Sequence, residues 1–154
     1  MYPYSNTIRR LQNTTRQRID EALTEMDLTS AQGVIIGYLM HSSAPPCPRD
    51  IEQEFHLSHA TVSGLLARME KKGFIRQEED PADHRCKRIF PLSKACACGE
   101  RIHRIILESE EQMVQGFSEQ ERQLFAALLT RAAHNMGICA NPCETQNKEE
   151  SAKC

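Results

Sequence analysis

One face of a predicted helix at residues 59–72 carries small and polar side chains that suit contact with a nucleic acid. Together with the residue before the helix, this face consists of Ser58, His59, Ala60, Thr61, Ser63 and Gly64. Hydroxyl groups can hydrogen-bond to base edges or to phosphate, and an alanine can contact the methyl group of thymine. The N-terminus of a helix also attracts phosphate. These residue types at this spacing predict a helix that reads double-stranded DNA.

Cations lie before, within and after this helix. They are Arg49, Arg68, Lys72, Arg85, Lys87 and Arg88. We expect Arg49, Arg68 and Lys72 to contact the phosphate backbone, because they flank the positions that would read bases. Between residues 84 and 94 no acidic side chain balances the cations, although the whole chain has a net charge of −2. Positive charge is therefore concentrated where it can attract phosphate.

A helix-turn-helix followed by a two-stranded ribbon would position these residues. Pro48 suits the first turn of a helix at residues 48–55, and Ser58 is a predicted N-cap for the helix that follows. Segments 74–77 and 87–92 are predicted strands, with turn-forming residues between them. An amphipathic helix with a merely solvated outer face would not explain the basic ribbon. The segment as a whole therefore favours DNA recognition.

Apolar stripes predict further helices on both sides of this segment. The stripe nearest the N-terminus is Ile8, Leu11, Thr15, Ile19, Leu23 and Met26. Its three- and four-residue steps form one face of a helix. Capping boxes at 29–32 and 118–121 start two more helices, and another is expected at 94–115. These helices have more apolar surface than one DNA-binding lobe can cover, so we expect two copies to pack together as a homodimer.

The predicted fold class is mainly α (α+β): a winged helix-turn-helix with a two-stranded wing, plus N- and C-terminal helices that form a dimerisation domain. Residues 1–28 are the expected N-terminal dimerisation helix, and residues 29–92 are the expected DNA-binding lobe. Residues 93–137 would supply the C-terminal dimerisation helices. The polar composition of residues 138–154 predicts a disordered tail.

Bulk composition is that of an ordinary globular domain. The chain has 154 residues, of which 40% are hydrophobic, and no run approaches the ~18 apolar residues of a membrane span. Because the N-terminus lacks an apolar signal region, we expect a cytoplasmic protein without a membrane partner. No nucleophile elbow, phosphate loop or metal-protease motif is present. We therefore expect no catalytic residues, no metal ligands and no cofactor.

Three segments resemble the MarR family of winged-helix regulators. They are LSHATVSGLLARMEKKGFI at 57–75, DPADHR at 80–85, and Leu92-Ser93. The resemblance covers nearly the whole chain, including the Leu28-Thr29-Ser30-Ala31-Gln32 start of the second helix. It implies a dimeric transcriptional regulator, usually a repressor, that a small-molecule effector or oxidation releases from DNA. Twofold symmetry of such a dimer predicts an inverted-repeat operator.

The resemblance also implies roles for single residues. Arg85 corresponds to the arginine of the wing that enters the minor groove, and Asp83 would orient it through an ion pair. Gly64 stands where the family often has an arginine, so a strong guanine reader is missing. Glu52 replaces a common small residue and places an acid near either the DNA face or the helix crossing.

The cysteines suggest a second function for the chain. Cys86 lies between Arg85 and Lys87, where cations favour the thiolate. Cys96 and Cys98 lie in the first turns of a predicted helix, but residues two apart on a helix point ~200° away from each other and cannot share a metal. The alternative function is a thiol-based redox or metal sensor with DNA binding as its output. A winged-helix protein that binds another protein is the third possibility.

Overall fold

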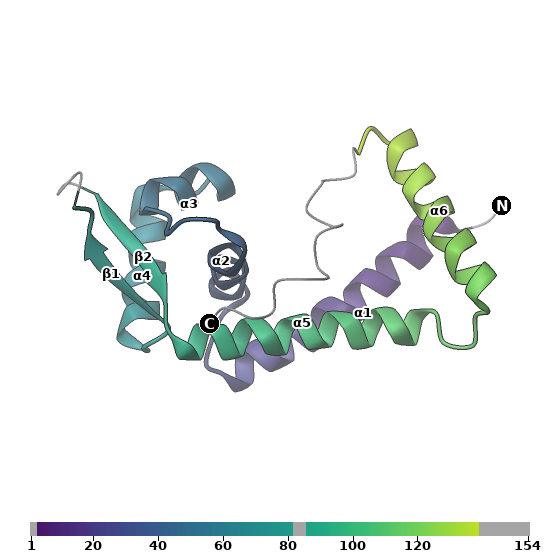
Figure 1. Ribbon diagram of the computed structural model, residues 1–154, viewed down its shortest axis with the longest axis horizontal. Helices are drawn as coiled ribbons and strands as arrows, with labels where there is room; N and C mark the ends of the chain where they lie inside the picture. The colour runs from purple at the N-terminus through teal and green to yellow at the C-terminus, as the bar shows by residue number, and fades with distance from the viewer. Residues whose placement is uncertain (1–2, 82–85, 139–154) are drawn as a thin grey trace. The chain divides into compact units, whose positions relative to one another are not determined.

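Among residues 3–81 and 86–138, which the structure describes, the computed structural model contains six α-helices and one two-stranded antiparallel sheet (Figure 1). In chain order they are α1 (Tyr4–Glu25), α2 (Ser30–His41), α3 (Pro48–Phe55), α4 (His59–Lys71), β1 (Ile75–Glu79), β2 (Lys87–Pro91), α5 (Ser93–Met113) and α6 (Glu119–Asn135). This order confirms the predicted mainly helical α+β fold with a winged helix-turn-helix. None of the described helices is both long enough and apolar enough to span a membrane.

The chain divides into two compact units, residues 1–108 and residues 109–154. The first unit contains α1 to α4, the ribbon and most of α5. The second contains the end of α5 and all of α6. Except for Ile138, the predicted tail at residues 138–154 lies outside the described residues.

Local sequence signals account for where the helices begin. Thr29 caps α2: its Oγ1 accepts a hydrogen bond from the Gln32 backbone N–H at 3.3 Å, and the Gln32 side chain accepts from the Thr29 N–H at 3.1 Å. Pro48 occupies the first turn of α3, where its missing N–H costs nothing. Both starts are the ones that the sequence predicts.

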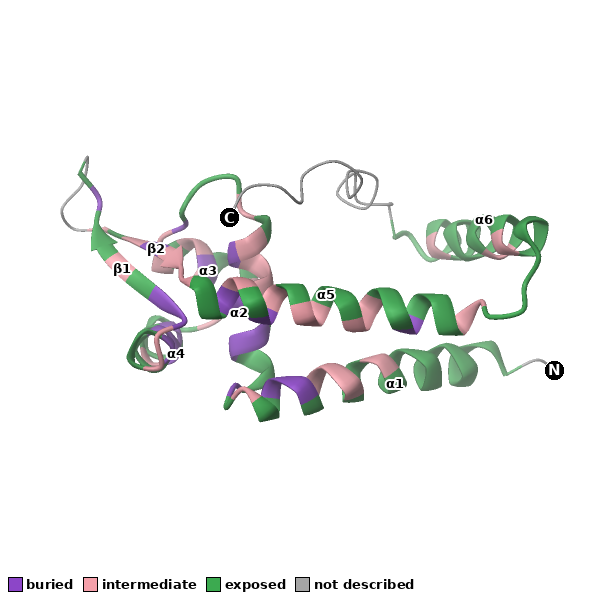
Figure 2. Cartoon of the chain, turned by 60° about the horizontal axis from the view of Figure 1, so that its bottom comes forward, coloured by how far each residue is buried: buried purple, intermediate pink, exposed green. Residues whose placement is uncertain are grey.

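The core of the first unit joins α2, α3, α4 and the ribbon. The largest fully buried apolar side chains are Ile35, Ile36, Ile51, Leu66, Met69, Ile75, Ile89 and Val62. The face of α4 that was expected to point inward does so, since Val62, Leu65 and Leu66 are all buried. β1 packs against α4, and β2 packs against α2 and α3 (Figure 2). Each buried aliphatic side chain contributes about 1.5–3 kcal/mol, so this core fixes the direction in which α4 faces.

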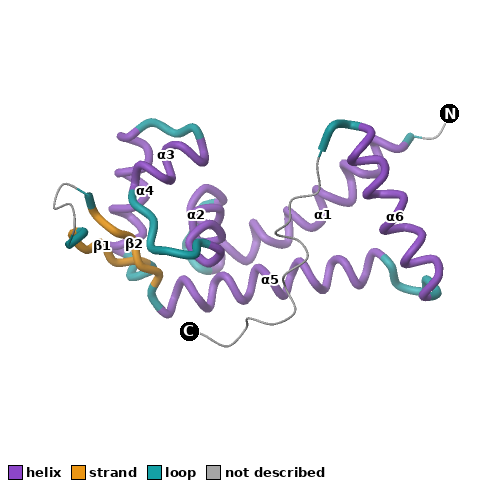
Figure 3. The backbone as a smooth tube through the Cα atoms, turned by 45° about the horizontal axis from the view of Figure 1, so that its top comes forward, coloured by secondary structure: helices purple, strands orange, loops and turns teal. Residues whose placement is uncertain are grey.

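The ribbon is bound on its second edge by the loop between α2 and α3. β1 and β2 pair antiparallel, with Ile75 opposite Pro91 and Glu79 opposite Lys87. On the other side of β2, the Ile89 N–H donates to the Pro46 carbonyl at 2.9 Å. Figure 3 shows this loop running beside β2. The base of the ribbon is therefore fastened to the start of α3.

In the second unit, Ser118 caps α6 as predicted. The Ser118 Oγ accepts from the Glu121 N–H at 3.3 Å, and the Glu121 carboxylate accepts from the Ser118 N–H at 2.8 Å. Arg122 donates two hydrogen bonds to Glu111, at 2.7 and 2.8 Å. None of the described residues of α6 is buried (Figure 2). This helix therefore presents its apolar side chains to solvent.

Candidate nucleic-acid interface

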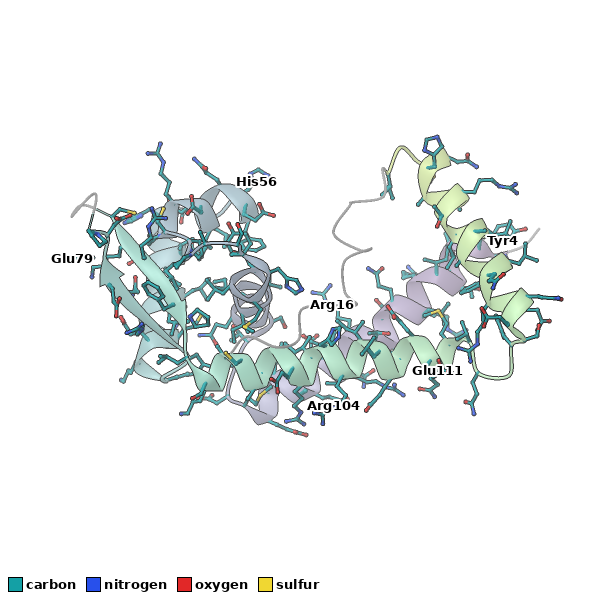
Figure 4. All side chains as sticks on the ribbon, in the orientation of Figure 1. Tyr4, Arg16, His56, Glu79, Arg104 and Glu111 are labelled. Atoms are coloured by element: carbon teal, nitrogen blue, oxygen red, sulfur yellow. The ribbon has the colours of Figure 1, made fainter. Side chains whose placement is uncertain are left out.

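The turn between α3 and α4 gives the helix-turn-helix its geometry. His56 ends α3 with a left-handed backbone conformation, φ 50° and ψ 41°, and the Leu57 N–H donates to the Glu52 carbonyl at 3.1 Å. Ser58 then caps α4, with its Oγ accepting from the Thr61 N–H at 3.3 Å. Figure 4 shows His56 at this turn and Glu79 at the outer end of β1. The chain thus reverses tightly and exposes the N-terminus of α4.

The residues predicted to read bases lie on the solvent face of α4. Ser58, His59, Ala60, Thr61 and Ser63 are exposed, and Gly64 is half-buried. The Ser58 Oγ and the Thr61 Oγ1 are hydrogen-bonded to each other at 2.8 Å, so these hydroxyls form a connected pair at the helix start. The fold therefore brings this set together on one surface. Arg49 on α3 and Arg68 on α4 are also exposed.

Glu52 on α3 contacts the first residue of α4, so it lies both between the two helices and beside the predicted DNA-facing surface. Its Oε1 is 2.7 Å from the Nδ1 of His59. The His59 side chain is 80% exposed, whereas that of Glu52 is 23% exposed. Glu52 therefore orients the first residue of α4 from the side of the preceding helix.

Gly64 has no side chain to fill the space beside the guanidinium of Arg68. A Cβ atom added at Gly64 would have the Arg68 Nη2 as its nearest neighbour, at 4.0 Å. The guanidinium of Arg68 thus extends back by one turn toward the position where the family often has an arginine.

The space beside Gly64 allows a prediction about stability. We expect Gly64→Ala to raise the free energy of unfolding by about 1 kcal/mol, because glycine is that much less favourable than alanine inside a helix and the added methyl would meet the Arg68 Nη2 at an ordinary van der Waals distance of 4.0 Å. Urea unfolding followed by circular dichroism would measure this. The matched substitution is Gly33→Ala in α2, where the new Cβ would be 2.6 Å from Cδ1 of the buried Leu23. Overpacking at position 33 should lower the free energy of unfolding by about 1–3 kcal/mol. If both substitutions changed the free energy of unfolding in the same direction, the geometry around one of the two glycines would be wrong.

Lys72 has an intramolecular partner. Its Nζ is 2.9 Å from the Oδ2 of Asp27, in the turn between α1 and α2, and also donates to the Asp27 carbonyl. The lysine side chain is 31% exposed. Lys72 therefore ties the end of α4 to the start of α2, and its predicted contact with phosphate stays a prediction.

The wing contains an ion pair that sequence reasoning missed. The Nε of Arg88 is 2.6 Å from the Oδ2 of Asp80, and its Nη1 donates to the Pro45 carbonyl at 3.1 Å. The hydrogen bond and the charge of Asp80 raise the pKa of Arg88. Arg88 thereby connects the wing to the loop before α3. The register pairs Arg88 with Glu78, and Asp80 lies beyond the end of β1, so strand pairing alone does not predict this ion pair.

The structure describes some of the other wing residues but not all of them. Lys87 is exposed at the start of β2, and its contact with phosphate stays a prediction. Asp83 and Arg85, predicted to form the ion pair that enters the minor groove, lie outside the described residues. Arg76 on β1 adds a further cation, which lies over the Phe90 ring at 4.9 Å from its centroid.

The cysteines of interest differ in environment. The pKa of the Cys86 thiol is raised, first by burial and then by the side chain of Cys47, while Arg88 opposes the shift. This direction is opposite to the expectation that neighbouring cations favour the thiolate. Burial also raises the pKa of Cys98, which is fully buried in α5, and Cys96 is half-buried. Cys47 was not singled out from the sequence, because its neighbour Cys86 is remote along the chain.

Comparisons with known proteins agree with this geometry. A family model described as the MarR family matches residues 26–85. The S. aureus MepR–DNA complex is 30% identical and covers 86% of this chain and 99% of its own, with a TM-score of 0.73. A structure from Clostridium acetobutylicum, described as a MarR family transcriptional regulator, is 31% identical over 87% of this chain and 98% of its own, with a TM-score of 0.70. The HTH-type transcriptional regulator YcgE of Bacillus subtilis, described as uncharacterized, is 26% identical over 98 residues, 64% of each chain.

Proposed function

This chain belongs to the MarR family of transcriptional regulators, and from that premise we propose that it is a homodimeric repressor that binds an inverted-repeat operator. A small-molecule or oxidative signal would release it from the DNA. The observation that carries the proposal is the exposed N-terminal face of α4. Ser58, Thr61 and Ser63 on this face are exposed, while Val62, Leu66 and Met69 anchor the opposite face in the core.

We assign α4 to a major groove and the wing to the adjacent minor groove. Arg49, Arg68 and Lys87 would contact phosphates, which is consistent with their exposure. The helix start from Ser58 to Gly64 would contact base edges, and Arg85, oriented by Asp83, would enter the minor groove. Lys72 and Arg88 are already paired with Asp27 and Asp80. Any contact of these two with phosphate would therefore be shared with an intramolecular carboxylate.

Exposed apolar side chains support the proposed homodimer. On α1 these are Tyr4, Ile8 and Leu11, and on α6 they are Leu124, Leu128 and Leu129. Apolar stripes of this kind mark interaction surfaces, and a second copy would cover them with residues 1–28 and 93–137 of each chain. Residues 29–92 would then form two DNA-binding lobes related by a twofold axis. Half-sites about one helical turn apart (~34–36 Å) follow from that symmetry.

Binding of the full-length protein to chromosomal DNA fragments tests the proposal. Footprinting should map an inverted repeat, and the genes next to it would point to the effector. The logarithm of the binding constant should fall linearly with the logarithm of salt concentration, because phosphate contacts release counterions. A winged-helix protein that binds another protein instead would have no salt-sensitive affinity for DNA. It would also tolerate charge reversal at Arg85, Lys87 and Arg88.

Arg85→Ala should weaken binding to the mapped operator about tenfold and lower the salt slope by about 1, because a largely electrostatic contact is lost. Fluorescence anisotropy titrations at several salt concentrations would measure both quantities. Arg104→Ala provides a matched control, since Arg104 is an exposed arginine of α5 away from the wing. Equal affinities of Arg85→Ala and the unaltered protein would remove the wing assignment.

A further inference from the structure

Two cysteines from distant parts of the chain lie near each other beside the outer end of the wing. Cys47 is the N-cap residue of α3, and Cys86 directly precedes β2. Both are free, half-buried thiols. The side chain of Cys47 lies close enough to the Cys86 thiol to raise its pKa, while the Cys86 Sγ also donates to the Lys87 carbonyl at 3.7 Å.

The backbone around these cysteines holds the thiols together. The Ile89 N–H donates to the Pro46 carbonyl at 2.9 Å, and the Asp80 N–H donates to the Cys86 carbonyl at 2.9 Å. Arg88 adds its 3.1 Å hydrogen bond to the Pro45 carbonyl. The Cys47 N–H is itself bound by the Asp50 carboxylate at 2.7 Å. One main-chain hydrogen bond and the side chain of Arg88 therefore hold the segment before α3 against β2, independently of the two sulfurs.

We propose that Cys47 and Cys86 form a redox-modifiable pair, which a peroxide oxidises to an intrachain disulfide that fastens the outer end of β2 to the start of α3 and lowers affinity for DNA. The effect on DNA rests on the proposed function, whereas formation of the disulfide does not. The site is distinct from Cys96 and Cys98, which lie on α5.

The oxidation proceeds in two balanced steps. The Cys47 sulfur, at the positive end of the α3 dipole, attacks one peroxide oxygen, the O–O bond breaks, and the departing oxygen leaves as water after protonation. Cys47 is then a sulfenic acid. The Cys86 sulfur attacks the Cys47 sulfur, the S–O bond breaks, and a second water leaves with the Cys86 proton. Two thiols have lost two electrons, and the peroxide has been reduced to two waters.

Formation of the disulfide would alter the wing, because an S–S bond is short. An S–S bond of about 2.05 Å is shorter than any hydrogen-bonded contact between two thiols, so Cys86 must move toward Cys47. Cys86 is the chain neighbour of Arg85 and Lys87, two of the proposed DNA contacts. This shift acts on the cations of the wing.

Peptide mapping after oxidation tests the disulfide. Full-length protein is treated with hydrogen peroxide, its remaining thiols are blocked with iodoacetamide, and the digest is analysed by mass spectrometry. We expect a linked peptide that contains Cys47 and Cys86, on a monomeric chain in a non-reducing gel, and its loss after dithiothreitol. Cys96→Ser should keep the linked peptide, whereas Cys47→Ser should lose it. A different pair, a link between two chains, or no link would overturn the proposal.

Anisotropy titration of the same samples tests the consequence for DNA. Oxidation should weaken operator binding by the unaltered protein at least about tenfold, and reductant should restore it. Cys47→Ser should bind like the reduced protein and should not respond to peroxide. Unchanged affinity of a fully linked protein would overturn the regulatory part. If the reduced protein bound no DNA, the proposed function would fail, and peptide mapping would still decide whether the disulfide forms.

Discussion

Leu128→Asp should leave the protein monomeric and lower its affinity for a two-half-site operator by about a hundredfold or more. Leu128 is 45% exposed and Leu124, one turn earlier on α6, is 59% exposed. In the proposed homodimer both would be covered by the second copy. A carboxylate at position 128 would then be buried in an apolar interface without a partner, which costs several kcal/mol. In a dimer, binding of one lobe raises the effective concentration of the other lobe at its half-site. Loss of this linkage lowers the affinity for a two-half-site operator by a factor of about 10²–10⁴.

Sedimentation equilibrium would measure the mass, and anisotropy with intact and half operators would measure the affinity. Thr130→Asp is the matched control, because residue 130 lies ~200° around the helix from residue 128 and introduces the same charge on an exposed position. It should remain dimeric and bind like the unaltered protein. A dimeric Leu128→Asp variant would show that α6 does not supply the interface. Leu128→Asp should bind a half operator about as tightly as the unaltered protein does. This result would separate loss of the dimer from loss of the fold.

Leu66→Ala should lower the free energy of unfolding by about 2–5 kcal/mol, the range for a large aliphatic side chain removed from a packed core. Leu66 is 1% exposed and belongs to the stripe of α4 that meets the rest of the first unit. The cavity left behind would loosen the helix that is proposed to read DNA. Chemical denaturation with urea would measure the change.

Arg68→Ala, two residues further along α4, is the contrasting variant. Arg68 is exposed, so its loss should change stability by no more than about 0.5 kcal/mol. Operator binding should weaken instead, with a salt slope lower by about 1, because a phosphate contact is removed. If Leu66→Ala were as stable as the unaltered protein, or if Arg68→Ala bound DNA equally well, the proposed division of α4 into a core face and a DNA face would be wrong.

Much of the fold could be predicted because its signals are local. The caps at Thr29 and Ser118 each act on a residue three positions later, and a cap together with a glutamine or glutamate at that spacing is visible in the sequence. The buried stripe of α4 follows helical periodicity in the same way. The exposed face from Ser58 to Gly64 is the complement of that stripe, so it was predicted together with it.

The side-chain pairs of the site could not be predicted in this way. Lys72 pairs with Asp27 across 45 residues, Arg88 with Asp80 across 8, and His59 with Glu52 across 7. In each case a cation or a histidine that sequence reasoning had assigned to DNA has a carboxylate beside it. The contact between Cys47 and Cys86 belongs to the same class. Burial, followed by the side chain of Cys47, raises the pKa of Cys86, which is opposite to the direction expected from the sequence.

The sequence by itself therefore determined the order of the helices, the winged helix-turn-helix and the face of α4 that is open to solvent. Each of these depends on capping, periodicity and turn-forming residues within a few positions along the chain. Only the tertiary structure decided which charged groups are already paired and which two cysteines meet. Such pairs depend on how the loop between α2 and α3 lies against β2 and how the turn after α1 lies against the end of α4. Packing of the shared core fixes those positions, and no spacing in the sequence encodes them.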